Sequence, residues 1–279
     1  MRTAVEKTLK MYVASKFIRS ESGRTLPTTS SRGRPMNVAA ASRKDLRDAI
    51  GHARKAQPPW AGRTAYNRGQ ILYRLAEILE DRVAALPTSE TDAHQSIDRA
   101  VHFAGWADKI TALLSSLNPV AHTYVNYSMV GPMGIFVAVP EASFGLTGMI
   151  EAICGPLVMG NTMMLVVPTE AAELAIALAE CIAVSDVPAG VVNILTGDVD
   201  SVIRVAARHD DLDGLYLVGA PLSHELLTEV RTENARVMRR LVQAADAETP
   251  APPGRLAQLA EVKTVWMSSA LMAGGGTAY

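Results

Sequence analysis

Four short apolar runs separated by helical patterns constrain the fold of this chain more than any other feature. The runs are GIFVAV (134–139), TMMLVV (162–167), VVNIL (191–195) and GLYLV (214–218), each bounded by glycine, proline or asparagine. Between them, helical periodicity covers about residues 146–159, 170–184 and 199–208. Apolar strands that alternate with helices form parallel sheets covered on both faces and joined by right-handed crossovers. The sequence therefore predicts an α/β fold with a doubly wound parallel sheet.

The N-terminal third predicts helices that accompany this sheet. Residues 11–19 alternate enough for one strand, and SESGR (20–24) follows it as a turn. Ser42 and Asp45 form a capping box that opens a helix to about Ala56, and Pro-Pro-Trp at 58–60 ends it. Residues 66–86 predict a strongly amphipathic helix. A third helix is expected from about His94 to Leu117, where Asn-Pro stops it.

The C-terminal part predicts a tether followed by a β-rich segment. A last helix is expected over about 223–242, and then a Pro- and Ala-rich linker over 244–260 that includes a short helix. We therefore divide the chain into a domain at 1–243, a linker at 244–260 and an arm or tail at 261–279. Within the domain, a β-ribbon is expected at about 122–134, because 122–137 begins with alternation and Met129–Gly134 then resembles a turn.

The ribbon and the C-terminal arm are β-prone segments that lack an obvious neighbour. A lone strand is marginal in water and leaves unpaired edges. The two segments should pair with each other, or with another subunit by strand addition. The alternative is that they pair only within this chain and cover its own sheet edge. Apolar residues suited to such a contact are Val262, Val265 and Trp266 in the arm, and Tyr124, Val125, Tyr127 and Met129 in the ribbon. The prediction is a small β oligomerisation arm.

Charge and composition exclude several classes of partner. The net charge is −1, so no global field attracts nucleic acid or a membrane surface. Residues 1–74 contain sixteen Lys and Arg against four Asp and Glu, which indicates a solvated basic face or, alternatively, a docking face for an acidic partner. The sequence shows no apolar signal region and no uninterrupted apolar span, so a cytoplasmic protein is expected. His209–Asp213 lacks the ligand spacing of a calcium loop, and no other metal spacing is present.

Three motifs in fixed order identify a resemblance. GPMGIFVAVPEASFG (131–145), GNTMMLVVPTEAAELAIALAE (160–180) and VPAGVVNILTG (187–197) resemble the coenzyme half of the aldehyde dehydrogenase family. The helix pattern NRGQILYRLAEILEDR (67–82) also resembles that family. The resemblance implies a Rossmann-type coenzyme domain with N-terminal helices and a β oligomerisation arm. It also implies that the family's catalytic domain, which should lie between Arg240 and Glu261, is absent.

The resemblance points to a degenerate catalytic site. The loop that supplies the family's oxyanion-hole asparagine corresponds to Pro140–Phe144, where Ala142 offers no side-chain donor. Losing one oxyanion donor costs an enzyme about 3 kcal/mol of transition-state stabilisation. Glu141 would add negative charge there, and Ser143 could donate only if the loop shifted by one residue. The family's general-base glutamate and nucleophilic cysteine have no counterpart, because Cys154 and Cys181 lie within apolar helical patterns that predict inert, buried thiols.

The coenzyme positions are only partly kept. Val167 stands where the family has a ribose-binding lysine, while Pro168 and Glu170 match the residues after it. Alternatively, Glu170 has no role in coenzyme binding and is simply an acidic residue stabilised by the dipole at a helix N-terminus. Gly219 matches the first glycine of the next loop, and His224 replaces the second. Between Lys109 and Arg204 there are eight acidic residues and no Lys or Arg, so NAD should bind weakly at most and NADP more weakly.

Three hypotheses follow. The chain is a catalytically inactive subunit that serves as structural or regulatory partner of an active aldehyde dehydrogenase, or it forms a homo-oligomer. Alternatively, it is an NAD-dependent aldehyde dehydrogenase that borrows a nucleophile across an interface, or an NAD-binding sensor. The missing cysteine and Ala142 favour the first, and Val167 with His224 weakens the sensor hypothesis. No metal cofactor is expected.

Overall fold

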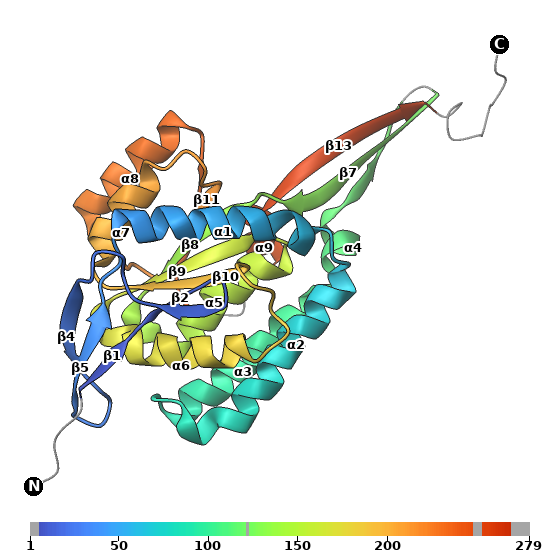
Figure 1. Cartoon of the computed structure of the whole chain (residues 1–279). Coiled ribbons are helices and arrows are strands. Elements are labelled where there is room, and N and C mark those ends of the chain that lie inside the picture. Colours follow the sequence, from blue (N-terminus) through green and yellow to red (C-terminus); the bar gives the residue numbers. More distant parts are fainter. Residues whose placement is uncertain (1–5, 121–122, 248–252, 269–279) are drawn as a thin grey trace, which may run out of the picture.

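A twisted, mainly parallel sheet forms the centre of the computed structural model, which describes residues 6–120, 123–247 and 253–268 (Figure 1). In these residues the sheet has seven strands in the order β12-β11-β8-β9-β10-β2-β3. Its parallel strands are β8 (Ile135–Pro140), β9 (Thr162–Val167), β10 (Val192–Thr196), β11 (Gly214–Val218) and β12 (Arg240–Ala244). The predicted parallel sheet is confirmed, and each of the four apolar runs became a strand.

Helices cover both faces of the sheet because alternate strand residues point to opposite sides. On one face, α1 (Arg43–Ala61), α7 (Val199–Ala207) and α8 (His224–Arg236) pack on residues such as Met164 and Val166. On the other face, α2 (Ala65–Arg82), α3 (Glu90–Trp106), α5 (Gly145–Val158) and α6 (Ala172–Ala183) pack on residues such as Met163 and Leu165. Figure 1 shows the sheet between α1 and the layer of α6, α2 and α3.

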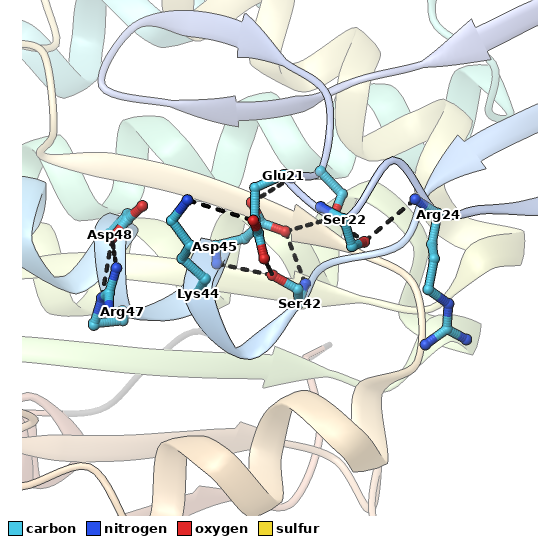
Figure 2. A network of polar contacts seen from close by, with 9 residues as sticks. Glu21, Ser22, Arg24, Ser42, Lys44, Asp45, Arg47 and Asp48 are labelled. Carbon is cyan, nitrogen blue, oxygen red and sulfur yellow. Dashed lines mark hydrogen bonds and ion pairs between the residues drawn. The ribbon is translucent and has the colours of Figure 1, made fainter.

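Helix α1 is longer than predicted. Ser42 caps it as expected: its side chain accepts the Asp45 N–H, and the Asp45 carboxylate accepts the Ser42 N–H at 2.8 Å. Figure 2 shows this cap within a wider network, in which Asp45 also accepts the Glu21 N–H at 3.1 Å. The predicted end near Ala56 was wrong, because the helix continues through Pro58 and Pro59. Burial of Trp60, whose indole N–H donates to the Leu157 carbonyl at 3.2 Å, stabilises this last turn.

Other N-terminal boundaries also differ from the prediction. The expected strand over 11–19 is a hairpin, β2 (Met11–Val13) and β3 (Lys16–Ile18), whose turn places Ala14 and Ser15 at positive φ without a glycine. Helix α2 continues as a 3-10 turn, η1 (Val83–Ala85), as its predicted length implied. The third helix stops at Trp106, and α4 (Ile110–Leu114) and strand β6 (Ser116–Asn118) occupy the remainder. A second sheet has the order β1 (Lys7–Leu9), β5 (Pro35–Ala39) and β4 (Thr25–Thr29).

The prediction of one helix over 223–242 was also wrong. Helix α8 ends at Arg236, and β12 then adds an edge strand beside β11. Arg239, between the two elements, donates to the carbonyls of Ala207 and Leu212 at 2.8 Å each. These bonds fix the reversal, and Met238 takes a positive φ of 51° there although it is not glycine. Apolar residues that suited a continuing helix face therefore form a strand instead.

The arm forms within this chain. Strand β13 (Ala260–Ser268) pairs antiparallel with β7 (Tyr124–Pro132), and β6 pairs with the other edge of β7. The expected turn at Met129–Gly134 was wrong, because β7 runs straight to Pro132. Short helix α9 (Pro253–Gln258) precedes β13; the linker residues 248–252 and the tail 269–279 lie outside the described residues. Figure 1 shows the arm projecting from the body.

Strand pairing separates the apolar residues that the sequence grouped together. The register sets Val262 opposite Val130, Val265 opposite Tyr127 and Trp266 opposite Asn126. Because successive side chains alternate, Trp266 and Tyr124 lie on one face, with ring centroids 6.4 Å apart, whereas Val265 and Met129 lie on the other. The arm therefore presents two faces, not one. Within the described part of the chain, no helix is both long and apolar enough to cross a membrane.

Candidate functional site

A hollow of about 420 Å³ lies where the central parallel strands end. Residues that follow four strands line it: Pro140, Glu141 and Ala142 after β8, Pro168, Thr169 and Glu170 after β9, Gly197 to Asp200 after β10, and Ala220 and Pro221 after β11. Ligands of open α/β sheets bind in crevices outside the carboxyl ends of the strands. The position of this hollow therefore marks it as the candidate site, and five residues predicted from the sequence line it.

Glu141 bridges the turns that follow β8 and β11. Its backbone N–H donates to the Val218 carbonyl at 2.8 Å, and its carboxylate Oε2 accepts the Ala220 N–H at 2.9 Å. The Ser143 hydroxyl donates to Oε1 of the same carboxylate at 2.9 Å. The hydrogen bond from Ala220, and then that from Ser143, lower the pKa of Glu141 below the usual range of a glutamate. The carboxylate is thus a fixed negative charge at the rim of the hollow.

Gly219 is required by this close contact. It has a positive φ of 84°, and a Cβ built there would lie 2.6 Å from Glu141 Oε2 and 2.5 Å from the ring of Phe144. Any larger residue would meet both side chains and would also be strained at that φ. The glycine that matches the family pattern therefore makes room for a side chain of this chain itself.

Of the other positions considered from the sequence, Val167, Ser143 and His224 do not line this hollow, whereas Glu170 does. Val167 is fully buried in the core, on the face of β9 that packs against α5 and α6, and it does not line the hollow. Glu170 is exposed within a 3-10 turn, η3 (Thr169–Ala171), which precedes α6. His224 is the exposed first residue of α8, as the helix-start interpretation implies. Ser143 lines a different hollow on the other side of the η2 turn (Ala142–Phe144).

That second hollow has a volume of about 820 Å³ and lies between α3 and the start of α5. Asp92 of α3 caps α5 there: its carboxylate accepts the Leu146 N–H at 2.8 Å and the Thr147 N–H at 3.1 Å. Helix α5 has no capping side chain of its own. The contact explains how α3 positions the β8–α5 turn, which separates the two hollows.

Both thiols lie away from any surface that a substrate could reach. Cys154 in α5 and Cys181 in α6 have no exposed area. Burial, together with the nearby Glu151 carboxylate, raises the pKa of Cys154 far above that of a free thiol. Burial also raises the pKa of Cys181. Since the thiolate is the nucleophile, both cysteines are chemically inert in the folded chain. The prediction that they are buried in apolar helices is confirmed.

A dinucleotide coenzyme fits the first hollow poorly. The carboxylates of Glu141, Glu170, Asp198 and Asp200 line it, and its lining includes no Lys or Arg. One backbone donor at each of the two nearby helix starts already has a side-chain partner in the chain. Asp198 accepts the Ser201 N–H at the start of α7, and Ser223 accepts the Leu226 N–H at the start of α8. A pyrophosphate would therefore meet negative charge and no cationic side chain in the lining of this hollow. Among the described residues, no cluster of acidic, His or Cys side chains could hold a metal ion.

Two buried polar groups outside this hollow were not identified from the sequence. Asn161 is fully buried, and its side chain makes four hydrogen bonds to backbone groups. Glu151, also fully buried, pairs with Arg99 and with Arg255, and it accepts a hydrogen bond from the Tyr216 hydroxyl. The Gly-Asn-Thr motif at 160–162 was a signal for the first. Nothing in the sequence indicated the second, because its members are far apart along the chain.

Comparison with known proteins decides the family. The sequence profile described as "Aldehyde dehydrogenase family" matches residues 18–247. The chain belongs to the aldehyde dehydrogenase family. It is 27% identical over 267 residues to the putative aldehyde dehydrogenase DhaS of Bacillus subtilis, covering 90% of this chain and 53% of that protein. It is also 27% identical to the mitochondrial benzaldehyde dehydrogenase of Antirrhinum majus, covering 81% of this chain and 45% of that protein. The chain thus spans about half the length of the curated relatives it matches.

Solved structures agree with this assignment at the level of the fold. An NAD+ complex of aldehyde dehydrogenase from Bacillus cereus superposes with a TM-score of 0.77 at 21% identity, over 85% of this chain and 50% of that one. A putative aldehyde dehydrogenase from Burkholderia cenocepacia gives a TM-score of 0.77 at 22% identity, over 84% of this chain and 50% of that one. The expected Rossmann-type α/β fold is confirmed.

Proposed function

We propose that this chain is a catalytically inactive aldehyde dehydrogenase-like subunit. Its role is structural or regulatory, either as a homo-oligomer or as a partner of an active aldehyde dehydrogenase. The observation that supports this most strongly is the burial of both cysteines, neither of which has any exposed area. Attack on an aldehyde by the family's chemistry needs an accessible thiolate, and burial suppresses both access and ionisation.

The turn after β8 supports the same proposal. Ala142 has no side chain that could donate to a developing oxyanion. Ser143 has one, but its hydroxyl donates to Glu141 at 2.9 Å. The Glu141 carboxylate beside it is anionic, and negative charge destabilises an oxyanion instead of stabilising it. Each of these groups works against acyl chemistry at this turn.

The direct test of inactivity is turnover by the purified chain. We expect no reduction of NAD or NADP with a panel of aliphatic and aromatic aldehydes, because no thiolate is available. The Cys154→Ser and Cys181→Ser variants are the matched controls, since they remove each thiol with little change in volume. Turnover that either variant abolishes would refute the proposal, and it would also require that thiol to leave the core.

The arm supports association with another subunit. Exposed apolar residues lie on both of its faces, including Leu117, Met129 and Trp266, with exposed fractions of 76%, 42% and 63%. An apolar surface of this kind on a projecting sheet is typical of an interface between proteins. Burying Trp266 and its neighbours would contribute several kcal/mol at about 25 cal/mol per Å² of apolar area.

Deletion of residues 261–279 tests this part of the proposal. We expect light scattering to report a smaller assembly for the truncated chain, while far-ultraviolet circular dichroism keeps the helical signal of the body. Met129→Glu, on the face of the arm with Val265, should weaken the assembly without removing a strand. Thr264→Glu places the same charge on the opposite face of the arm. The difference in assembly mass between the two variants shows which face contacts the partner. A deletion that leaves both mass and melting unchanged would contradict a role of the arm in association.

We also propose that the chain binds NAD with only weak affinity. The hollow lies at the strand ends, and the related Bacillus cereus enzyme is described as an NAD+ complex. The carboxylates that line the hollow oppose a pyrophosphate, and the extra phosphate of NADP needs Arg or Lys. Titration calorimetry should therefore give weak affinity for NAD and still weaker affinity for NADP. Tighter binding of NADP would contradict the argument from charge.

A further inference from the structure

The contact between Glu141 and Ala220 places an anion of this chain in the turn between β11 and α8. Ala220 lies between the end of β11 and the N-cap of α8, and it lines the hollow together with Glu141. Glu141 Oε2 accepts the Ala220 N–H at 2.9 Å, and Gly219 leaves the space that the carboxylate occupies. Backbone N–H groups between a strand and a following helix bind phosphates in many α/β proteins, because they donate to anionic oxygen near the helix dipole.

We propose that Glu141 is a built-in competitor for the phosphate position of this hollow. Its carboxylate takes the hydrogen bond from Ala220 that a pyrophosphate would otherwise accept, and its charge repels the incoming anion. The inference rests on the part of the proposed function that assigns weak NAD binding to the hollow, and it names the residue that causes the weakness. The ligand class that it excludes is a dinucleotide or another pyrophosphate ester.

Glu141 differs from the other acidic residues of the hollow in what it contacts. Asp198 accepts a hydrogen bond inside its own helix cap, at 3.2 Å from the Ser201 N–H. Asp200, in the first turn of α7, contributes charge to the same hollow from another strand end. Only Glu141 among them is fixed to the turn before α8, by Ala220 on one oxygen and by Ser143 on the other. Removal of the Glu141 charge should therefore raise the affinity for an anion at the Ala220 N–H more than removal of another negative charge from the same hollow.

Neutralisation of matched carboxylates separates the local effect from bulk charge. Glu141→Gln removes the charge and keeps an acceptor, while Glu141→Ala removes both. Asp200→Asn removes one charge from the same hollow and leaves the Ala220 N–H unchanged. Ser143→Ala removes the second partner of Glu141 and keeps its charge. Affinities for inorganic pyrophosphate and for NAD are measured by calorimetry on the full chain, and the Ala220 amide is followed by nitrogen-15 NMR.

We expect Glu141→Ala to bind pyrophosphate and NAD at least tenfold more tightly than the unaltered chain, which corresponds to about 1.4 kcal/mol. Glu141→Gln should give a smaller gain, because its amide oxygen still competes for the N–H. Asp200→Asn and Ser143→Ala should change either affinity by less than about threefold, or about 0.65 kcal/mol. Pyrophosphate should shift the Ala220 amide resonance in Glu141→Ala.

Several results would overturn the competition at Ala220. Equal gains in Glu141→Gln and Asp200→Asn would show that bulk charge alone weakens binding. Unchanged or unmeasurable pyrophosphate binding in both Glu141 variants would show that the position does not bind phosphate, and Glu141→Gln serves here if the alanine variant does not fold. A gain for pyrophosphate without one for NAD would refute the assignment to a dinucleotide. Aldehyde turnover by the unaltered chain, in contrast, would contradict the proposed inactivity and leave this competition intact.

Discussion

Asn161 is the residue whose replacement should most clearly separate the arm from the body. Its Oδ1 accepts the N–H groups of Met133 and Gly134 at 2.8 and 2.9 Å, where β7 passes into β8. Its Nδ2 donates to the Leu259 carbonyl at 2.8 Å, directly before β13, and to the Pro156 carbonyl at 3.2 Å. One amide side chain therefore joins two strands of the arm, β7 and β13, to the end of α5.

The expected cost of Asn161→Ala follows from the groups that it leaves without partners. The buried N–H of Gly134 and the partly buried N–H of Met133 lose their acceptor, and each unsatisfied buried group costs about 1–3 kcal/mol. The Pro156 carbonyl still accepts the backbone N–H of residue 161 at 3.1 Å in the variant. Loss of the side-chain bond to this carbonyl therefore adds little to the cost. We therefore expect a loss of about 2–6 kcal/mol in the free energy of unfolding, from a typical total of about 5–15 kcal/mol.

Urea unfolding and amide hydrogen exchange measure the two parts of this prediction. Exchange should accelerate in β7 and β13 more than in β9 and β10, because the change acts at the base of the arm. Asn193→Ala is the matched control: Asn193 is also fully buried, and it accepts the Ala14 N–H at 3.0 Å far from the arm. A free energy within about 0.5 kcal/mol of the unaltered chain would refute the reasoning, since that is the range of neutral surface changes. Exchange in the arm that matches the control would refute it equally.

Three further predictions concern buried polar groups and thiols. Arg239→Met should destabilise the fold by about 3–5 kcal/mol in urea unfolding, because the carbonyls of Ala206, Ala207 and Leu212 lose a charged donor in a buried site. Glu151→Ala should cost a similar amount, since it leaves Arg99 and Arg255 without their shared buried partner. Both thiols should resist a thiol reagent until the chain unfolds, because burial raises their pKa. Their contribution to stability should be complete below the unfolded-state pKa of about 8.5 and decline above it, by up to about 1.4 kcal/mol per pH unit for each thiol; constant stability from pH 8 to 10 would contradict this.

The sequence predicted the central sheet well because each of its parallel strands from β8 to β11 is visible as a short apolar run in the local sequence. Each of β8, β9, β10 and β11 is a short apolar run with a glycine, proline or asparagine at its border, and no competing period is present. Strand β12 was missed for the opposite reason. Its residues continue the periodicity of α8, and the signal that stops that helix is Met238, an exposed residue at positive φ where glycine is usual. Tertiary contacts of Arg239 determine that reversal.

The candidate site was predicted in its position along the chain, and less well in its geometry. Residues after parallel strands meet at one edge, so Pro140, Glu141, Pro168 and Glu170 could be expected to share a hollow. The sequence could not indicate that Glu141 binds Ala220, because the contact joins residues 79 positions apart. It also could not show that Val167 lies in the core and not in the hollow, since that depends on the helices that cover both faces of the strand: Val166 and Val167 are both buried, on opposite faces.

The arm shows how pairing changes a conclusion drawn from composition. Val265 and Trp266 are adjacent in sequence and both apolar, so the sequence predicted a single apolar contact face. Because side chains alternate along a strand, the two residues lie on opposite faces of the arm. Around Trp266, the face includes a polar ladder in which Asn118 donates to Ser128 at 2.9 Å and Ser128 bonds with Thr264 at 2.9 Å. The opposite face has Met129 opposite Lys263 and Tyr127 opposite Val265. A partner that covers the arm would therefore meet two chemically different surfaces.

The segments that lead from the edge strand β12 to the arm, including α9, make several contacts with the body. Arg240, which begins β12, donates to the Gln258 carbonyl at 3.2 Å and lies 3.6 Å from the Glu261 carboxylate. Leu256 of α9 is fully buried, so this short helix packs into the core as an integral part of the body. These contacts hold the base of the arm against the edge of the sheet, so the position of the arm is set by Arg240 and Leu256 as well as by Asn161.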